Sequence, residues 1–481
     1  MQDLVHRALN TAQVLGASYA DVRFVHSEIE SIAVKDGKVA GISSEESRGY
    51  GIRVLWDGAW GFAASSQLAE AEVDRVVEQA ISIAKASRLA QHHPVALGNT
   101  VTSRGSYETP VSEDPFLVPL EEKLAILLAA DAAMGTIKGI RTREASLGWQ
   151  RQTKLFANTE GAWVEQKIVE TGGGIEATAV SPDNMQRRSY PNSYGRHTGT
   201  GGFELIRASD LPGHALQIAE EAVALIVAPP CPEMVTTLVL DSSQMALQIH
   251  ESIGHAIELD RVLGWEASFA GTSFLKPDLA NNFRYGSELI NVTANATTAG
   301  GLGTFGFDDE GIPAQVTPII RDGIFLNFIT SRETATALNG ISNGTMRADS
   351  WNHIPLIRMT NINLEPGTFS SLEALLDDVK EGVFLQTNKS WSIDDRRLNF
   401  QFGTEIAREI KNGKLGRILC NPVYSGITPG FWASCDGLGD RSQWRMWGTL
   451  NCGKGQPCQM VHVGHGTSPG RFRNVQLGIK R

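Results

Sequence analysis

A proline pair at residues 229 and 230 divides the sequence into two parts with different patterns of apolar residues. Proline ends a helix because its ring fixes φ and it has no backbone N–H to donate. Before the pair, strand-like stretches alternate with long helical ones. After it, short strands and Gly-rich turns dominate. Because 481 residues are too many for one hydrophobic core, we expect an N-terminal α+β domain at 1–230 and a C-terminal β-rich domain at 231–481.

The N-terminal part has the signals of a hairpin sheet flanked by long helices. Asp36-Gly37 and Asp57-Gly58 each separate two strand-like stretches, and Asp-Gly supplies the positive φ angles of a type I′ turn. A further hairpin is expected at Glu160-Gly161. The apolar spacing predicts strands over 19–26 and on both sides of each turn, and helices over 3–16, 68–90, 120–135 and 203–227.

The C-terminal part begins with a short apolar strand over 234–240 that ends in Asp-Ser-Ser, a cluster typical of a helix N-cap. The helix expected after it contains the run from His250 to His255. A second helix is expected over 370–379, where a Ser and Glu373 form a capping pattern. The fold class predicted from both parts is therefore α+β, with the helix of His250 carried by the β-rich domain.

The pair His250-Glu251 on a helix is a combination with a chemical use. A neutral imidazole binds Zn²⁺ well, and a neighbouring carboxylate can take a proton from water that the metal activates. The second histidine, His255, follows after five residues rather than the usual four. Five residues turn a regular α-helix by about 140° net, so the two rings would diverge. If both bind one ion, we predict a widened or broken helix near Gly254.

The motif alone leaves other interpretations open. His250 and His255 also fit two partly buried helix residues with ordinary hydrogen bonds. If they bind catalytic zinc, a third protein ligand is required. By residue chemistry, the Cys452 thiolate and the His462/His465 pair are about equally good candidates for the third ligand. The remaining candidates are Glu258, Asp260 and His353.

Charge and cysteine content exclude some classes of partner. The net charge of −10, with no basic tract, disfavours nucleic acid and anionic membrane surfaces. The sequence has no run of about 18 apolar residues, so we expect no membrane span. The N-terminus does not have the pattern of a signal peptide. Five sparse cysteines favour reduced thiols over a disulfide framework. We therefore expect a cytoplasmic protein that binds neither nucleic acid nor membrane.

The segment HESIGHAIELD resembles the signature of the TldD/PmbA family of metallopeptidases. Further resemblances follow the family's order along most of the chain, in DGKVAGISSEESRGYGIRVLWDGAWGFAA, FDDEGIPAQVTPIIRDGIFLNFITSRETA, NGTMRADSWNHIPLIRMTNINLEPG and NCGKGQPCQMV. The family has an active type with HExxxH and a partner type that has lost it. Because the motif is present, the sequence resembles the active, TldD-like type.

The resemblance implies a zinc peptidase with one ion per active subunit. It implies His250, His255 and Cys452 as ligands and Glu251 as general base. Spacing does not distinguish zinc from another divalent metal. The implied substrates are small, unfolded or flexible peptides, cut in a closed chamber that the N-terminal domain helps to form. The chamber would be a dimer, either of two identical chains or with a site-less PmbA-like paralogue.

Five further residues are candidate contributors to the site. Glu258 and Asp260 either orient a histidine through its free ring nitrogen or form an ion pair with the next arginine. Asp309, in an Asp-Asp-Glu-Gly run, belongs to a substrate-binding loop or to a solvated turn. Arg347 and His353 either stabilise the oxyanion of a tetrahedral intermediate or form structural hydrogen bonds.

Two other functions are compatible with the sequence. One is a scaffold subunit that binds peptide without cutting it, in which the metal is absent or structural. The other is hydrolysis of a non-peptide carbonyl compound, because metal-activated water attacks many carbonyls. Metal analysis distinguishes the scaffold subunit from an enzyme. A screen of casein beside ester and amide compounds distinguishes non-peptide hydrolysis from peptide cleavage. The sequence leaves the roles of Cys458, His462 and His465 open.

Overall fold

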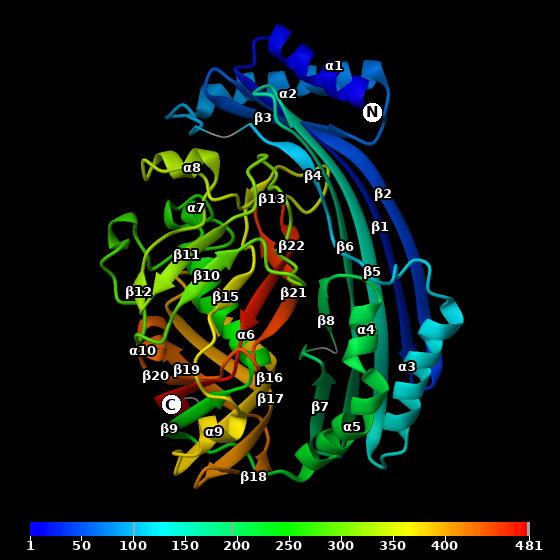
Figure 1. Ribbon diagram of the computed structural model, residues 1–481, viewed down its shortest axis with the longest axis vertical. Coiled ribbons are helices and arrows are strands. Elements are labelled where there is room, and N and C mark those ends of the chain that lie inside the picture. The colour runs from blue at the N-terminus through cyan, green and yellow to red at the C-terminus, as the bar shows by residue number, and fades with distance from the viewer. Residues whose placement is uncertain (100–101, 194–195, 479–481) are drawn as a thin grey trace.

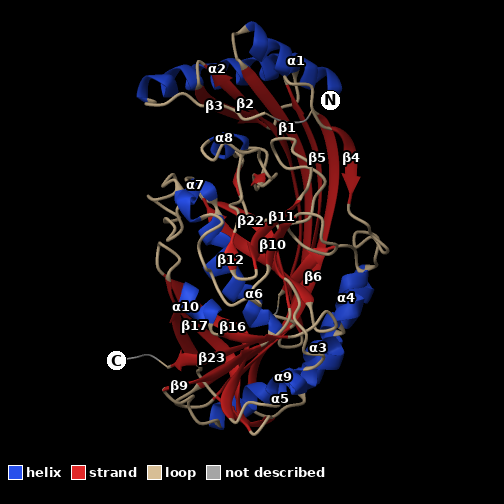
Figure 2. Ribbon diagram, turned by 60° about the vertical axis from the view of Figure 1, so that its left-hand side comes forward, coloured by secondary structure: helices blue, strands red, loops and turns tan. Residues whose placement is uncertain are grey.

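The computed structural model describes residues 1–99, 102–193 and 196–478, and it confirms the α+β class. A sheet of long, curved N-terminal strands lies beside a C-terminal unit built from shorter strands and helices (Figure 1). Coloured by secondary structure, the molecule has helices at both ends of the long sheet and short helices within the second unit (Figure 2). None of the helices in the described ranges is long and apolar enough to cross a membrane.

The N-terminal sheet has eight strands: β1 (Tyr19–Lys35), β2 (Lys38–Trp56), β3 (Ala59–Ser65), β4 (Arg104–Glu108), β5 (Ile140–Asn158), β6 (Trp163–Val180), β7 (Met185–Tyr190) and β8 (His197–Thr200). The order is β3-β2-β1-β5-β6-β4, and β7 and β8 also pair with β6. The two predicted type I′ turns are confirmed, with φ of 50° and 78° at Asp36-Gly37 and 45° and 74° at Asp57-Gly58. These turns fix the register of three neighbouring strands.

Helices cover the two ends of this sheet: α1 (Gln2–Val14), α2 (Glu70–Ala90), α3 (Leu120–Gly135), α4 (Glu204–Ser209) and α5 (Leu211–Val227). α1 and α2 pack on β1–β3, and α3 and α5 pack on the other end of the long strands. The single helix expected over 203–227 is wrong, because the chain breaks at Asp210, where φ is 43°. The Asp210 side chain accepts a hydrogen bond from the backbone N–H of Gly213 and thereby caps α5.

The C-terminal unit has a seven-stranded sheet: β9 (Met234–Leu240), β16 (Glu381–Ile393), β17 (Asn399–Lys411), β18 (Lys414–Leu419), β19 (Val423–Ile427), β20 (Cys435–Leu438) and β23 (Gly470–Leu477). The order is β16-β9-β23-β19-β17-β18, with β20 beside β23. Because β16 also pairs with β17, five of these strands form a closed ring of pairings.

Smaller strand groups complete this unit: a sheet of β10 (Val292–Asn295), β11 (Val316–Arg321), β12 (Ile324–Phe325) and β15 (Ile362–Leu364), and ribbons β13 (Met346–Arg347) with β14 (Leu356–Ile357) and β21 (Arg445–Lys454) with β22 (Gln459–Thr467). Its helices are α6 (Ser242–Ile249), η2 (His250–Gly254), η3 (His255–Ile257), α7 (Leu259–Val262), η4 (Pro277–Leu279), α8 (Arg332–Thr336), α9 (Leu372–Leu376) and α10 (Thr428–Ala433). α9 is shorter than the helix expected over 370–379, and its cap is Ser371, which accepts a hydrogen bond from the backbone N–H of Ala374.

Buried ion pairs join the two units. Asp309, between β10 and β11, accepts hydrogen bonds from Arg23 of β1 at 3.0 Å and from Lys154 of β5 at 2.7 Å. Burial raises the pKa of Asp309, but the charges of Lys154 and Arg23 outweigh burial and lower it to about 2. An unfolded aspartate titrates near about 3.9. The ion pairs therefore stabilise the fold fully above that pH, and their contribution is lost as the pH falls towards 2.

Replacing Asp309 with Ala should lower the free energy of unfolding by about 3–5 kcal/mol, because it leaves two buried cations without their carboxylate. Urea denaturation followed by circular dichroism measures this loss. The matched control is Glu108→Ala, which removes the partner of Lys167 in an exposed pair on the same sheet. That change should cost less than about 1 kcal/mol. Equal, small losses for both variants would contradict a structural role for the Asp309 pairs.

Candidate metal centre

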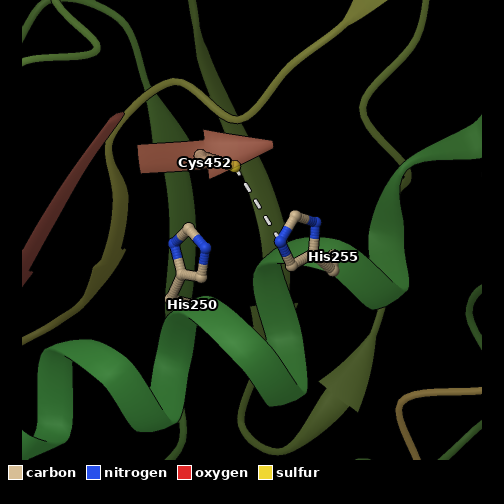
Figure 3. A group of neighbouring side chains, drawn as sticks. All are labelled: His250, His255 and Cys452. Atoms are coloured by element: carbon tan, nitrogen blue, oxygen red, sulfur yellow. Dashed lines mark hydrogen bonds between the residues drawn. The ribbon is translucent and has the colours of Figure 1, made fainter. Parts of the chain in front are cut away.

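The predicted distortion of the helix near Gly254 is confirmed. α6 continues as one π-helical turn over His250–Gly254, and a 3₁₀ turn follows over His255–Ile257. The backbone N–H of His255 donates to the carbonyl of His250, an i to i+5 bond that widens the turn by one residue. As a result both imidazoles lie on one side of the helix, with ring centroids 4.8 Å apart and planes at 84° (Figure 3).

Gly254 is required here for space. Its φ of −54° is an ordinary helical value, so conformational freedom is not the reason for a glycine. A Cβ at this position would overlap the Sδ of Met359. The absence of a side chain therefore allows the π-turn to pack against Met359 without displacing it.

Cys452 reaches the two histidines from a distant part of the chain. It lies on β21, just after a register shift between Thr449 and Cys452 in the pairing with β22. Such a bulge re-aims the side chains that follow it. The Cys452 Sγ lies 3.8 Å from His255 Nε2 (Figure 3), and one ligand atom from each of His250, His255 and Cys452 falls within 4.8 Å of the others. All three side chains are buried.

One ring nitrogen of each histidine already has a partner. Nδ1 of His255 lies 3.0 Å from Glu258 Oε2, and Nδ1 of His250 lies 2.8 Å from His465 Nε2. These contacts leave Nε2 of each ring for another partner. Burial lowers the pKa of both His250 and His255, which favours the neutral imidazole that binds metals.

The surroundings of the Cys452 thiol favour its deprotonation. Burial raises the pKa of Cys452, but the positive charge of Arg358 and the contact with His255 outweigh burial and lower it to about 7. Arg358 also donates to the carbonyl of Cys452. Two imidazoles and a thiolate match the Cys/His chemistry of zinc sites. On tetrahedral zinc, a nitrogen and a sulfur ligand are separated by about 3.6 Å, close to the 3.8 Å between His255 and Cys452.

Glu251 lies beside this group and has a partner that sequence analysis missed. Arg397 donates from Nη1 to Glu251 Oε2 at 2.6 Å. Arg397 lies in the turn between β16 and β17 and adopts a left-handed φ of 61°. No local pattern identifies it, because the contact spans 146 positions and depends on how the β16–β17 hairpin packs over α6.

Of the two acidic residues after the motif, Glu258 contacts a histidine of the centre, whereas Asp260 contacts Lys454. Glu258 accepts from His255 and also from Arg261 Nε at 3.2 Å. Lys454, two residues after Cys452, lies 2.8 Å from Asp260 and 3.5 Å from Glu258. This buried network ties the end of the helix to the strand that carries the cysteine.

The other candidate residues, Arg347, His353 and Asp309, lie outside the group of His250, His255 and Cys452. Arg347 donates to the backbone carbonyls of Met359 and His462, and His353 contacts Asp349 at 2.6 Å. Asp309 lies in the ion pairs between the units. Arg347 also lines a cavity of about 370 Å³ between the units. This position is compatible with contact to a substrate, which stays a prediction.

Glu251 and His250 open into a cavity of about 280 Å³. Its walls come from both units, since Arg196 and Thr198 line it together with residues 448–451 of β21. The cavity is large enough for a few side chains of a ligand and far smaller than a folded domain.

Comparison with known proteins places most of the chain in one family. Models of PmbA/TldA metallopeptidase domain 1, central domain and C-terminal domain match residues 20–84, 113–228 and 233–476. A metalloprotease of Methanocaldococcus jannaschii is 33% identical over 409 residues, which cover 85% of this chain and 86% of that protein. A zinc metalloprotease TldD homolog of Saccharolobus solfataricus is 22% identical over 434 residues, 87% of this chain and 88% of the relative.

A solved structure shares the fold. The crystal structure of TldE from Thermococcus kodakarensis superposes with a TM-score of 0.71 at 16% identity, over 99% of this chain and 100% of that one. At this identity the likeness concerns the fold alone.

Proposed function

The chain belongs to the TldD/PmbA family of metallopeptidases, and on that premise we propose that it cuts flexible peptides at a divalent-metal centre held by His250, His255 and Cys452. Zinc is the expected ion, supported by the donor set and by the name of one relative. The observation that carries the proposal is the buried convergence of the three donors, with both histidine Nδ1 atoms already engaged elsewhere.

The chemistry assigns distinct tasks to the residues of the centre. A divalent metal supplies Lewis acidity, which polarises a carbonyl and makes water more acidic. Glu251 acts as general base: its Oε1 takes the proton from the attacking water and later passes it to the leaving amine. Arg397 holds the other oxygen, Oε2, and so fixes the direction in which the carboxylate points.

The free edge of β21 supports an extended peptide as substrate. Among the described strands, β21 pairs only with β22, and residues 448–451 of β21 line the cavity that contains Glu251. An extended peptide can add to such an edge through backbone hydrogen bonds, whereas most backbone groups of a folded protein are already paired. Small, unfolded or flexible peptides are therefore the proposed substrates.

Replacing Arg397 with Met should lower kcat/KM by about 10- to 100-fold, because a charge-assisted hydrogen bond to Glu251 contributes about 1.5–3 kcal/mol. Steady-state kinetics on a fluorogenic peptide measures the change, and bound metal should not change. The matched control is Arg396→Met, which removes the exposed neighbouring arginine and should leave activity unaltered. Equal rates for wild type and Arg397→Met would contradict the assigned role.

The proposal also covers the assembly of the protein and its cellular compartment. We propose a dimer that encloses the site, formed by two copies or with a site-less relative of the TldE kind; the shared fold of TldE supports such a pairing. All five cysteines are free, which supports a reducing, cytoplasmic environment. Mass measurement of the complex purified from its native source distinguishes the two kinds of dimer.

The proposed activity is tested with casein as an unstructured substrate, beside ester and amide compounds and a stable folded protein. We expect cleavage of casein alone, its loss with a chelator and its return with zinc. Binding of casein without cleavage by the metal-loaded protein would point to a scaffold subunit. Turnover of the esters without casein would point to a different hydrolase.

A further inference from the structure

A third buried imidazole, His465, lies against the centre. It is carried by β22, and its side chain is fully buried. Its Nε2 lies 2.8 Å from Nδ1 of His250, and the two rings are perpendicular, with centroids 4.9 Å apart and planes at 87°. It is therefore placed behind His250, on the side opposite the nitrogen that remains for a metal.

The hydrogen bonds of His465 define which nitrogen carries each proton. Its Nδ1 faces the carbonyl oxygen of Ile362 at 3.3 Å, and a carbonyl can only accept. Nδ1 of His465 therefore bears hydrogen, and its Nε2 presents a lone pair. That lone pair accepts from Nδ1–H of His250, which leaves Nε2 of His250 without hydrogen.

The position of His465 is built by its neighbours in the chain. A Cβ at Gly464 would overlap the Asn361 side chain, and a Cβ at Gly466 would overlap the ring of Trp444. The backbone N–H of Gly466 also donates to Asn363 Oδ1 at 2.8 Å. Gly464 thus lets β22 lie close to Asn361 and the start of β15, and Gly466 leaves room for Trp444, so that His465 reaches the carbonyl of Ile362.

We propose that His465 is a positioning residue that fixes the tautomer of His250 and makes the two histidine ligands unequal. This inference rests on the proposed metal function. His255 is backed by the carboxylate of Glu258, and a carboxylate partner raises the basicity of a ligand. His250 is backed by a neutral imidazole, so it donates less charge and keeps the bound ion a stronger Lewis acid.

The test compares His465→Gln with His465→Met, two side chains of similar length. Gln keeps a neutral acceptor for Nδ1–H of His250, and Met does not. Chelator competition gives the zinc dissociation constant, and the absorption spectrum of the Co²⁺-substituted protein reports the ligand field. We expect Met to weaken binding by about 10- to 100-fold and to change the cobalt bands, and Gln to restore both. Wild-type affinity and spectrum in His465→Met, or an equal loss in both variants, would overturn the proposal.

His462→Leu is the matched control, because this histidine lies on the same strand but contacts Glu170 of β6 at 2.6 Å. Its zinc affinity should equal that of wild type. If His465→Met does not fold, the test uses the cobalt spectrum of His465→Gln alone. We expect this spectrum to match that of the wild type, and a changed spectrum would overturn the inference. Zinc binding that survives His250→Ala and Cys452→Ala would instead refute the proposed metal site, whatever happens at position 465.

Discussion

Glu251→Gln is expected to lower kcat by about 10²- to 10⁴-fold, the usual contribution of a general acid-base residue. Gln has nearly the same shape as Glu but cannot accept the proton of the attacking water. It can still contact Arg397, which is 2.6 Å from the carboxylate in the wild-type chain. The metal content should not change, because the three proposed ligands are intact. Peptide cleavage and elemental analysis of the same sample test both statements.

Glu251→Asp provides the graded comparison for this experiment. Aspartate keeps a carboxylate but withdraws it by one methylene, so its activity should fall between those of Gln and Glu. Normal peptide cleavage by Glu251→Gln would remove Glu251 from the mechanism. Loss of metal in that variant would assign Glu251 to the structure of the site instead.

Loss of a residue that hydrogen-bonds a metal ligand typically weakens metal binding by about 10- to 100-fold. We expect Cys452→Ala to weaken zinc binding by more than this. The reason is that this change removes a donor atom itself, the thiolate that Arg358 and His255 hold at a pKa of about 7. Peptidase activity should disappear at zinc concentrations that saturate the wild type. Chelator competition and circular dichroism together measure binding and folding.

Cys458→Ala is the matched control for the cysteine experiment. Cys458 follows six positions later at the turn between β21 and β22, and it is exposed. Its removal should leave zinc affinity unchanged. If Cys452→Ala bound zinc as tightly as Cys458→Ala, the thiolate would not be a ligand and the centre would have to be completed differently.

Local sequence patterns predicted those parts of the fold that depend on neighbours in the chain. The Asp36-Gly37 and Asp57-Gly58 turns, α3 and the start of α6 match the expectations because turn and cap chemistry act over a few residues. The extent of β1 was not predicted. Two strand-like stretches merge into one strand of 17 residues because β2 and β5 pair with it along both edges.

The candidate site also has parts that local sequence predicted and parts that it did not. The five-residue spacing predicted the distorted turn at His250–Gly254 on geometric grounds. Cys452 was indicated by the family resemblance, since chemistry alone ranked it beside His462 and His465. Arg397 could not be found, and the place of His465 behind His250 was left open, because both depend on contacts between residues far apart in the chain.

X-ray absorption at the zinc edge, on the wild-type protein loaded with one equivalent of zinc, tests whether Cys452, His250 and His255 bind the metal. We expect one sulfur neighbour at about 2.3 Å, from Cys452, and imidazole nitrogens at about 2.0–2.1 Å, from His250 and His255. The sulfur neighbour should be lost in Cys452→Ala and kept in Cys458→Ala. A first shell of nitrogen and oxygen alone, or a sulfur neighbour that persists in Cys452→Ala, would contradict this assignment.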